Sequence, residues 1–151
     1  MIKTKINPLV SIILRTKNEE RWITKCLKKI FEQSYKNFEI IIVDNHSTDN
    51  TLKRAQKYNI KSIIKIDKFY PGKAINLGIS KSKGDLLVIL SSHCIPVNNK
   101  WLSFLVSTIL VCLGFLFLGC IARRSSSILS SLSLSLEYCL SSILTTVTSQ
   151  N

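Results

Sequence analysis

The sequence predicts an α/β fold in which helices cover a mostly parallel sheet. Short apolar runs alternate with amphipathic or polar-capped segments, in the order strand, helix, strand, helix, strand, helix, strand. The apolar runs are near-continuous and the connections between them are short, which is typical of buried parallel strands. With 151 residues, the chain is long enough for one ordinary domain and too short for two.

The first half of the pattern is a strand, a helix and a second strand. Residues 10–14 form an apolar run after Pro8, and we expect this strand to end near Thr16. An amphipathic helix follows, for which Asn18 is the expected N-cap. Its apolar positions recur at three- and four-residue spacings and are Trp22, Cys26, Leu27, Ile30 and Phe31. Residues 38–43 are the second predicted strand.

The second half repeats this alternation. Polar residues 45–49 supply capping side chains for a helix marked by Leu52, Ala55 and Tyr58. The later elements are a strand at residues 61–66, a loop at 67–72, a short helix at about 73–80, a Lys-Gly turn at 83–84 and a strand at 86–90.

Charge divides the chain near residue 107. There are 27 charged residues up to that point and only three in the remaining 44. The 22 uncharged residues between Lys100 and Arg123 are long enough to cross a membrane as a helix. We therefore predict a domain at 8–107, a transmembrane or apolar helix at 102–122, and a Ser/Leu-rich low-complexity tail at 123–151. The tail is interpreted as a truncated or frame-shifted end, with a functional membrane anchor as the alternative.

The net charge of +12 lies almost wholly in the first 107 residues. Such a surface attracts phosphorylated small molecules, anionic lipid headgroups or nucleic acid, or it is simply a solvated Lys-rich face. No nucleic-acid-binding motif occurs, so we expect no nucleic-acid partner. Five cysteines without a CxxC spacing indicate reduced thiols rather than a zinc site or a disulfide framework. We therefore expect a cytoplasmic domain, with membrane association through the apolar segment.

Ligands of parallel α/β sheets bind at the carboxyl ends of the strands, and all four of these ends are polar here. The segments are residues 15–20, 44–49, 67–72 and 91–96. A carboxylate such as Asp44 accepts hydrogen bonds from a ribose diol or a base N–H. Alternatively, Asp44 and Asp49 only cap the following helix.

Two other positions combine suitable chemistry with an ordinary explanation. Lys73 follows Gly72 at a helix start and either faces an anion such as a diphosphate or is solvated. His93 and Cys94 are a metal ligand, or a nucleophile with its base, or structural residues. Neither a P-loop nor a GxGxxG fingerprint is present.

Ordered stretches of the chain resemble family-2 glycosyltransferases of the GT-A fold. Residues 16–19 match the family's Thr-x-Asn-Glu turn after the first strand. Residues 43–49 match its Val-Asp-Asp-Gly-Ser-Thr-Asp stretch, with Asn45 and His46 replacing Asp and Gly. Residues 73–79 match its Ala-Arg-Asn-x-Gly-Ile segment.

A further match is Gly84-Asp85, which sits where Gly-Glu or Gly-Asp precedes the family's fourth strand. The resemblance covers about residues 8–107. It implies a glycosyltransferase that binds a nucleotide-sugar donor for transfer to a polysaccharide or other acceptor. The expected donor-binding residues are Thr16, Lys17, Glu19, Asp44, Lys73 and Asn76. With Arg15, the two lysines in this set would offset the diphosphate charge.

The chain departs from this family in two ways. The family's metal-binding Asp-x-Asp after the fourth strand is Ser91-Ser92-His93 here, so the Mg²⁺ or Mn²⁺ that the resemblance implies lacks both carboxylates. Either His93 is a substitute ligand, or cationic side chains stabilise the diphosphate without a metal, or turnover is lost. The family's acceptor half is also absent after Ser107. The alternative function is therefore a non-catalytic, membrane-tethered module that binds a nucleotide or another anion.

Overall fold

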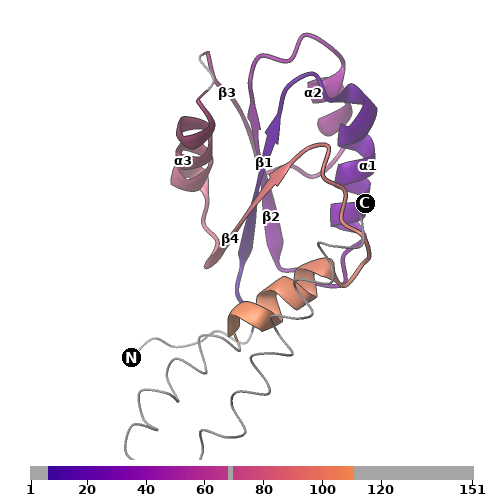
Figure 1. Cartoon of the computed structure of the whole chain (residues 1–151), viewed down its shortest axis with the longest axis vertical. Coiled ribbons are helices and arrows are strands. Elements are labelled where there is room, and N and C mark those ends of the chain that lie inside the picture. Colours follow the sequence, from indigo (N-terminus) through magenta and orange to yellow (C-terminus); the bar gives the residue numbers. More distant parts are fainter. Residues whose placement is uncertain (1–6, 68–69, 111–151) are drawn as a thin grey trace, which may run out of the picture. The chain divides into compact units, whose positions relative to one another are not determined.

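The computed structural model describes residues 7–67 and 70–110 (Figure 1). The chain divides into two units, Met1–Phe104 and Leu105–Asn151, and the fold described here is that of the first unit.

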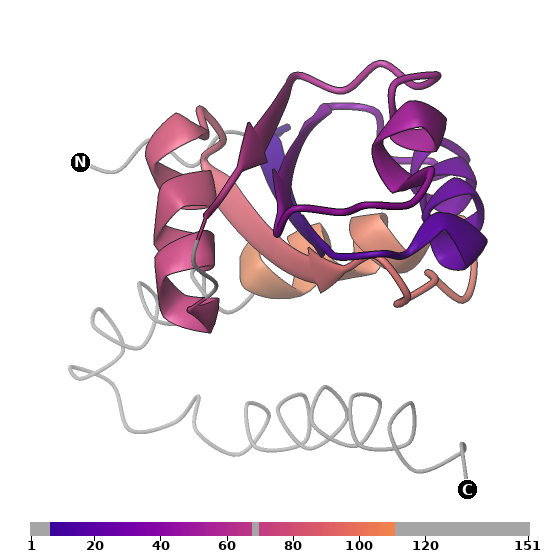
Figure 2. The ribbon, with the colours of Figure 1, turned by 90° about the horizontal axis from the view of Figure 1, so that it is seen from above.

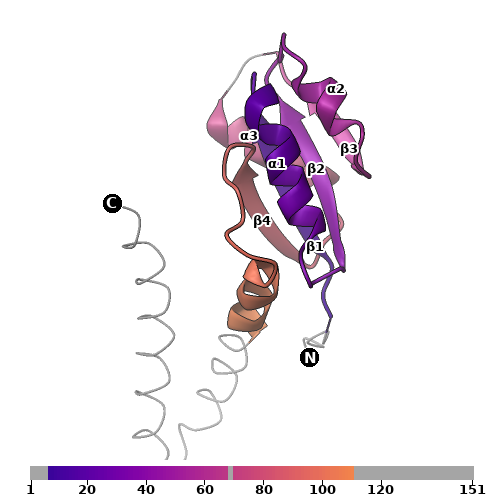
Figure 3. The same cartoon turned by 90° about the vertical axis from the view of Figure 1, so that its right-hand side faces the viewer.

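A four-stranded parallel sheet forms the centre of this unit. The strands are β1 (Val10–Thr16), β2 (Phe38–Asp44), β3 (Ser62–Lys65) and β4 (Leu86–Ser91), in the spatial order β3-β2-β1-β4. The helices are α1 (Glu20–Phe31), α2 (Thr51–Ala55) and α3 (Pro71–Lys81). Helices α1 and α2 cover one face of the sheet and α3 covers the other (Figures 2 and 3). The predicted fold class, a parallel sheet with flanking helices, is therefore confirmed.

The core lies around the two central strands. The side chains of residues 12–14 in β1 and 40–42 in β2 are almost completely buried, as their near-continuous apolar sequence predicts. Helix α1 buries Ile23, Leu27 and Ile30 against one face of this pair. On the other face, Ala74 of α3 packs into a cluster with Ile13 and Val43.

Three predictions about elements are wrong in detail. Helix α2 has only five residues, so Tyr58 falls in the turn after it. Strand β4 is not buried on both faces. Its residues Leu87 and Ile89 are 42% and 47% exposed, because β4 lies at the edge of the sheet. Asn18 does not cap α1; Glu19 precedes the helix instead, without a side-chain capping bond.

The predicted apolar helix at 102–122 is described only in part. Residues 101–110 are helical, and residues 111–122 lie outside the described range. The start of this helix is fixed to the segment just after α1, because the Leu102 backbone N–H donates to Gln33 Oε1 at 2.9 Å. Within the described residues, no helix is both long and apolar enough to span a membrane.

Candidate functional site

The carboxyl ends of three strands converge on one small region. Thr16 at the end of β1 is paired in register with Asp44 at the end of β2, and Arg15 is paired with Ser91 at the end of β4. The buried Ser92 hydroxyl donates to Thr16 Oγ1 at 3.0 Å and ties the first and fourth strands together. A cavity of about 290 Å³ opens at this edge, lined by Arg15, Thr16, Lys17, Glu19, Asn45 and Ser91.

The loops after β1 and β2 hold each other in place. Asn18 has a φ of 51°, in the left-handed region that Asn tolerates better than most residues. In this conformation its backbone N–H donates to Ser47 Oγ at 2.9 Å, and its Oδ1 accepts from the Thr48 N–H at 2.8 Å. Asn18 is therefore a bridge between two loops, which is why its side chain does not serve the helix.

Asp49 caps the starts of both α1 and α2. Its Oδ1 accepts from the Thr51 N–H at 2.9 Å, and its Oδ2 accepts from the Glu20 N–H at 3.1 Å. Burial raises the pKa of Asp49, but these hydrogen bonds outweigh that effect and leave the pKa below its ordinary value. The capping interpretation of Asp49 is therefore confirmed, and it extends to a second helix.

Asp44 is completely buried and is not among the residues that line the cavity. Its Oδ2 accepts from the Ser47 N–H at 3.0 Å, and its Oδ1 accepts from the Ser47 hydroxyl. These bonds close the turn after β2. A contact between Asp44 and a ribose stays a prediction.

Glu19 and His93 form a pair that the sequence does not reveal. Glu19 Oε1 lies 2.8 Å from His93 Nδ1, and the Ser91 hydroxyl lies 3.2 Å from the same nitrogen. Glu19 lines the cavity, whereas His93 is not among the lining residues. His93 is the residue after β4 that the sequence predicts as a metal ligand.

The residues at this strand end do not fit the divalent cation expected from the family resemblance. Mg²⁺ and Mn²⁺ prefer several oxygen ligands, usually carboxylates. Here the Glu19 carboxylate contacts His93, so its partner is an imidazole, and Ser92 is committed to Thr16. Nowhere in residues 7–67 and 70–110 do three His, Cys, Asp or Glu side chains gather in a way that would hold a metal. Ligation by His93 alone stays a prediction.

Basic groups dominate the β1 side of the cavity. Arg15 Nε is buried and has no hydrogen-bond partner within the described part of the chain, although a buried N–H donor normally has one. Lys17 is exposed next to it and also lines the cavity. Lys73 and Asn76 are exposed on α3, and neither belongs to the lining. The structure therefore groups Thr16, Lys17 and Glu19 and leaves the two α3 residues outside.

Two lining residues, Asn45 and Ser91, were not predicted to contact the donor. The available signal was their position directly at a strand end. Taken together, the lining offers two cations, two hydroxyl groups, an amide and the Glu19 carboxylate. The cations outnumber the carboxylate, so the set suits a polar, anionic ligand.

Comparison with known proteins gives the family context of this site. Residues 11–111 match the family described as Glycosyl transferase family 2. Over 98 residues, the chain is 43% identical to the dolichyl N-acetyl-alpha-D-glucosaminyl phosphate 3-beta-D-2,3-diacetamido-2,3-dideoxy-beta-D-glucuronosyltransferase of Methanococcus voltae. This match covers 60% of this chain and 30% of that protein.

Two solved structures share the fold. Staphylococcus aureus TarS 1-349 in complex with UDP is 27% identical with a TM-score of 0.61, covering 67% of this chain and 32% of that one. The mannosyltransferase PcManGT from Pyrobaculum calidifontis, in complex with GDP-Man and Mn²⁺, is 24% identical with a TM-score of 0.55, covering 64% and 30%. This chain thus spans about a third of the length of the relatives it matches.

Proposed function

This chain belongs to glycosyl transferase family 2, and we propose that its edge cavity binds a nucleoside diphosphate sugar, the donor for sugar transfer to a saccharide or other acceptor. The proposal concerns donor binding first, because the described residues supply the strand ends at which ligands of parallel α/β sheets bind.

The observation that carries this proposal is the unpartnered Nε of Arg15 beside Lys17. A buried N–H donor without a partner is costly, and an anionic oxygen would satisfy it. A guanidinium binds phosphate oxygens through paired hydrogen bonds, and an adjacent ammonium adds charge. A diphosphate bound here would thus find one cation within the wall and one at the rim.

The other predicted donor-binding residues take roles around this anion. Thr16 and Glu19 line the wall, where they would contact the nucleoside. Asp44 can accept a ribose or base hydrogen bond only if the residues that cover it move, since the carboxylate is buried in this structure. Lys73 and Asn76 would approach the donor from α3.

This scheme includes no metal-dependent step, because the residues after β4 do not fit a hard divalent cation. TarS, to which the chain is similar, is known in complex with UDP. A uridine nucleotide is therefore the first donor to test.

Calorimetric titration of the full chain with UDP and UDP-GlcNAc, in the presence of EDTA, tests the proposal. We expect Arg15→Gln to weaken binding by about tenfold or more, because it removes charge-assisted hydrogen bonds to the diphosphate. Lys100→Gln, at an exposed site outside the cavity, is the control for net charge. Equal affinity in wild type and Arg15→Gln would contradict the proposal. Unchanged affinity in Asp44→Ala would remove Asp44 from the site.

A turnover assay separates the two functions that remained open from the sequence. Hydrolysis of the donor, or transfer of its sugar to an added acceptor, supports the glycosyltransferase. Saturable binding without turnover supports a non-catalytic nucleotide-binding module.

A further inference from the structure

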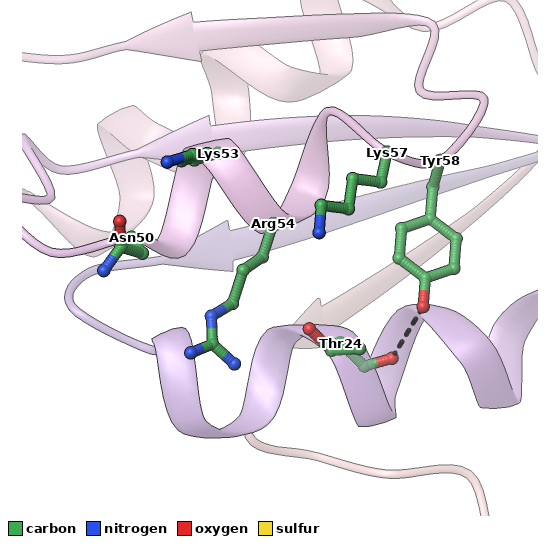
Figure 4. Close-up of a pocket in the computed structure, with 6 residues that line it drawn as sticks. All are labelled: Thr24, Asn50, Lys53, Arg54, Lys57 and Tyr58. Atoms are coloured by element: carbon green, nitrogen blue, oxygen red, sulfur yellow. Dashed lines mark hydrogen bonds between the residues drawn. The ribbon is translucent and has the colours of Figure 1, made fainter.

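A second cavity, of about 590 Å³, lies between α1 and the α2 segment (Figure 4). It shares no lining residue with the edge cavity. Its lining residues are Thr24, Asn50, Lys53, Arg54, Lys57 and Tyr58. Arg54 and Tyr58 extend from the α2 segment toward α1 (Figure 4). This volume is within the usual range for small-molecule sites.

The cavity is strongly basic. Three of its six lining residues are cations, and no acidic residue occurs between Asp49 and Asp67 in the sequence. Lys53 lies in α2 and Lys57 in the turn after it, so two like charges line the same cavity. Glu20 of α1 is the acid that reaches this region, and Arg54 Nη2 lies 3.2 Å from its Oε1.

Neighbouring cations differ from the two cavity lysines in having partners. Arg21 and Lys25 lie 4.9 Å and 5.3 Å from the centre of the Trp22 ring. Two further α1 lysines, at positions 28 and 29, lie 3.9 Å and 2.9 Å from Glu32. The side chains of Lys53 and Lys57, in contrast, make no ion pair, hydrogen bond or ring contact with the described residues. The unmatched charge of this surface therefore gathers at the cavity.

The polar groups that remain are mostly donors. The Tyr58 hydroxyl is committed to the Thr24 carbonyl at 3.2 Å, as the dashed line in Figure 4 marks. The Asn50 amide donates to Glu20 at 3.1 Å. What is left for a ligand is mainly two ammonium groups and the N–H groups of Arg54 that do not bind Glu20, with the Thr24 hydroxyl and the Asn50 side-chain carbonyl beside them. Such a set requires an acceptor-rich anion, and phosphate oxygens suit it best.

We propose that the cavity between α1 and α2 binds a phosphate-bearing ligand, either a soluble phosphoester or diphosphate or the headgroup of an anionic lipid. The site is independent of donor binding at the strand ends, since the two cavities have different walls. Lys53 and Lys57 supply the charge, and Arg54, held by Glu20, supplies a fixed guanidinium.

Two binding measurements on the full chain test this site. The first is calorimetric titration with inorganic pyrophosphate, and the second is sedimentation with phosphatidylglycerol or phosphatidylcholine vesicles. The test variant is Lys53→Gln with Lys57→Gln. The matched control is Lys81→Gln with Lys83→Gln, which removes the same charge from exposed positions at the end of α3 and just after it. Lys17→Gln is added because pyrophosphate can also bind at the strand-end site, which Lys17 lines.

We expect the Lys53/Lys57 variant to weaken at least one of the two interactions by about tenfold or more, and the Lys81/Lys83 variant to change it less than about twofold. Loss of pyrophosphate binding identifies a soluble ligand, and loss of binding to phosphatidylglycerol vesicles alone identifies a lipid headgroup. Equal losses in the two double variants, loss only in Lys17→Gln, or no binding by the wild type in either assay would overturn the proposal.

Discussion

Glu19 and His93 are 74 positions apart in the chain, yet Glu19 Oε1 and His93 Nδ1 lie 2.8 Å apart at the carboxyl edge of the sheet. The pair joins the loop after β1 to the loop after β4. His93 occupies the position at which the resemblance places a carboxylate metal ligand. Its imidazole contacts Glu19, a carboxylate from the loop after β1.

Glu19→Gln should strengthen UDP binding in EDTA by about threefold, because it removes a negative charge from the wall of a cavity that takes an anion. Calorimetry measures this change. Weaker UDP binding that appears only when Mn²⁺ is added would instead identify Glu19 as a metal ligand. The free energy of unfolding should change by less than about 1 kcal/mol, since partly exposed ion pairs contribute little.

His46→Gly should raise the free energy of unfolding by about 1 kcal/mol. His46 has a φ of 49°, a conformation that costs non-glycine residues about this much. The lost contact with Asp67 is highly exposed and contributes little. Urea denaturation measures the difference. Asn18→Gly is the control, because Asn18 has the same backbone conformation but its side chain accepts from the Thr48 N–H; this variant should gain nothing.

Gly84→Ala should lower the free energy of unfolding by about 1–3 kcal/mol, through steric overlap. A Cβ at this position would lie 2.5 Å from the Ser11 backbone nitrogen, which a rotamer change cannot relieve. Gly72→Ala is the matched control, since a Cβ there meets nothing within 4 Å. That residue lies in the first turn of α3, so its replacement should be neutral or slightly stabilising. Equal effects of the two variants would contradict the packing described for Gly84.

Glu39 should make the fold more stable at neutral than at acidic pH. Burial raises its pKa, but hydrogen bonds from Lys61, Ser11 and the Lys83 N–H outweigh this and leave the pKa below the ordinary value of 4.5. Its stabilising contribution is therefore complete above about pH 4.5 and is lost as pH falls through the lower, folded-state pKa. Urea unfolding at pH 7 and pH 3 should show a smaller loss for Glu39→Gln than for wild type. Asp49 and Glu20, whose pKa values are also lowered, supply a residual pH dependence in the variant.

The two cysteines in the described range should react differently with iodoacetamide. Cys94 is exposed, whereas Cys26 is buried, and burial together with the nearby Cys94 raises the pKa of the Cys26 thiol to about 12. Because the thiolate is the reactive form, we expect modification of Cys94 and protection of Cys26 at pH 8. Peptide mass spectrometry gives the extent of each reaction. Comparable modification of Cys26 in the folded chain would contradict its burial.

Local sequence was sufficient to predict the sheet. The apolar runs at residues 10–14 and 38–43 lie within β1 and β2, because each is buried on both faces and its burial depends on little beyond its own composition. Strand β4 has the same apolar character but is half exposed at the sheet edge. Its position in the strand order, which its own sequence does not encode, decides that difference.

The site could be predicted only as a region. Thr16, Lys17 and Glu19 were expected at a strand end, and they do line the cavity there. The partners of these residues were not predictable, because Asn18 bonds to residues 29 and 30 positions away and Glu19 to one 74 positions away. Asn18 has the side chain of a helix cap, and only the folded loop shows that Thr48 competes for it.

The bonds that join residues 18–20 to residues 47–51 have a consequence for ligand capture. These two loops reach their final shape during folding, since each backbone N–H from Asn18 to Glu20 already donates to a side chain of the other loop. A molecule that enters the edge cavity meets preorganised walls and spends little conformational entropy on ordering them. Its association rate is then governed by diffusion and electrostatic steering rather than by loop closure.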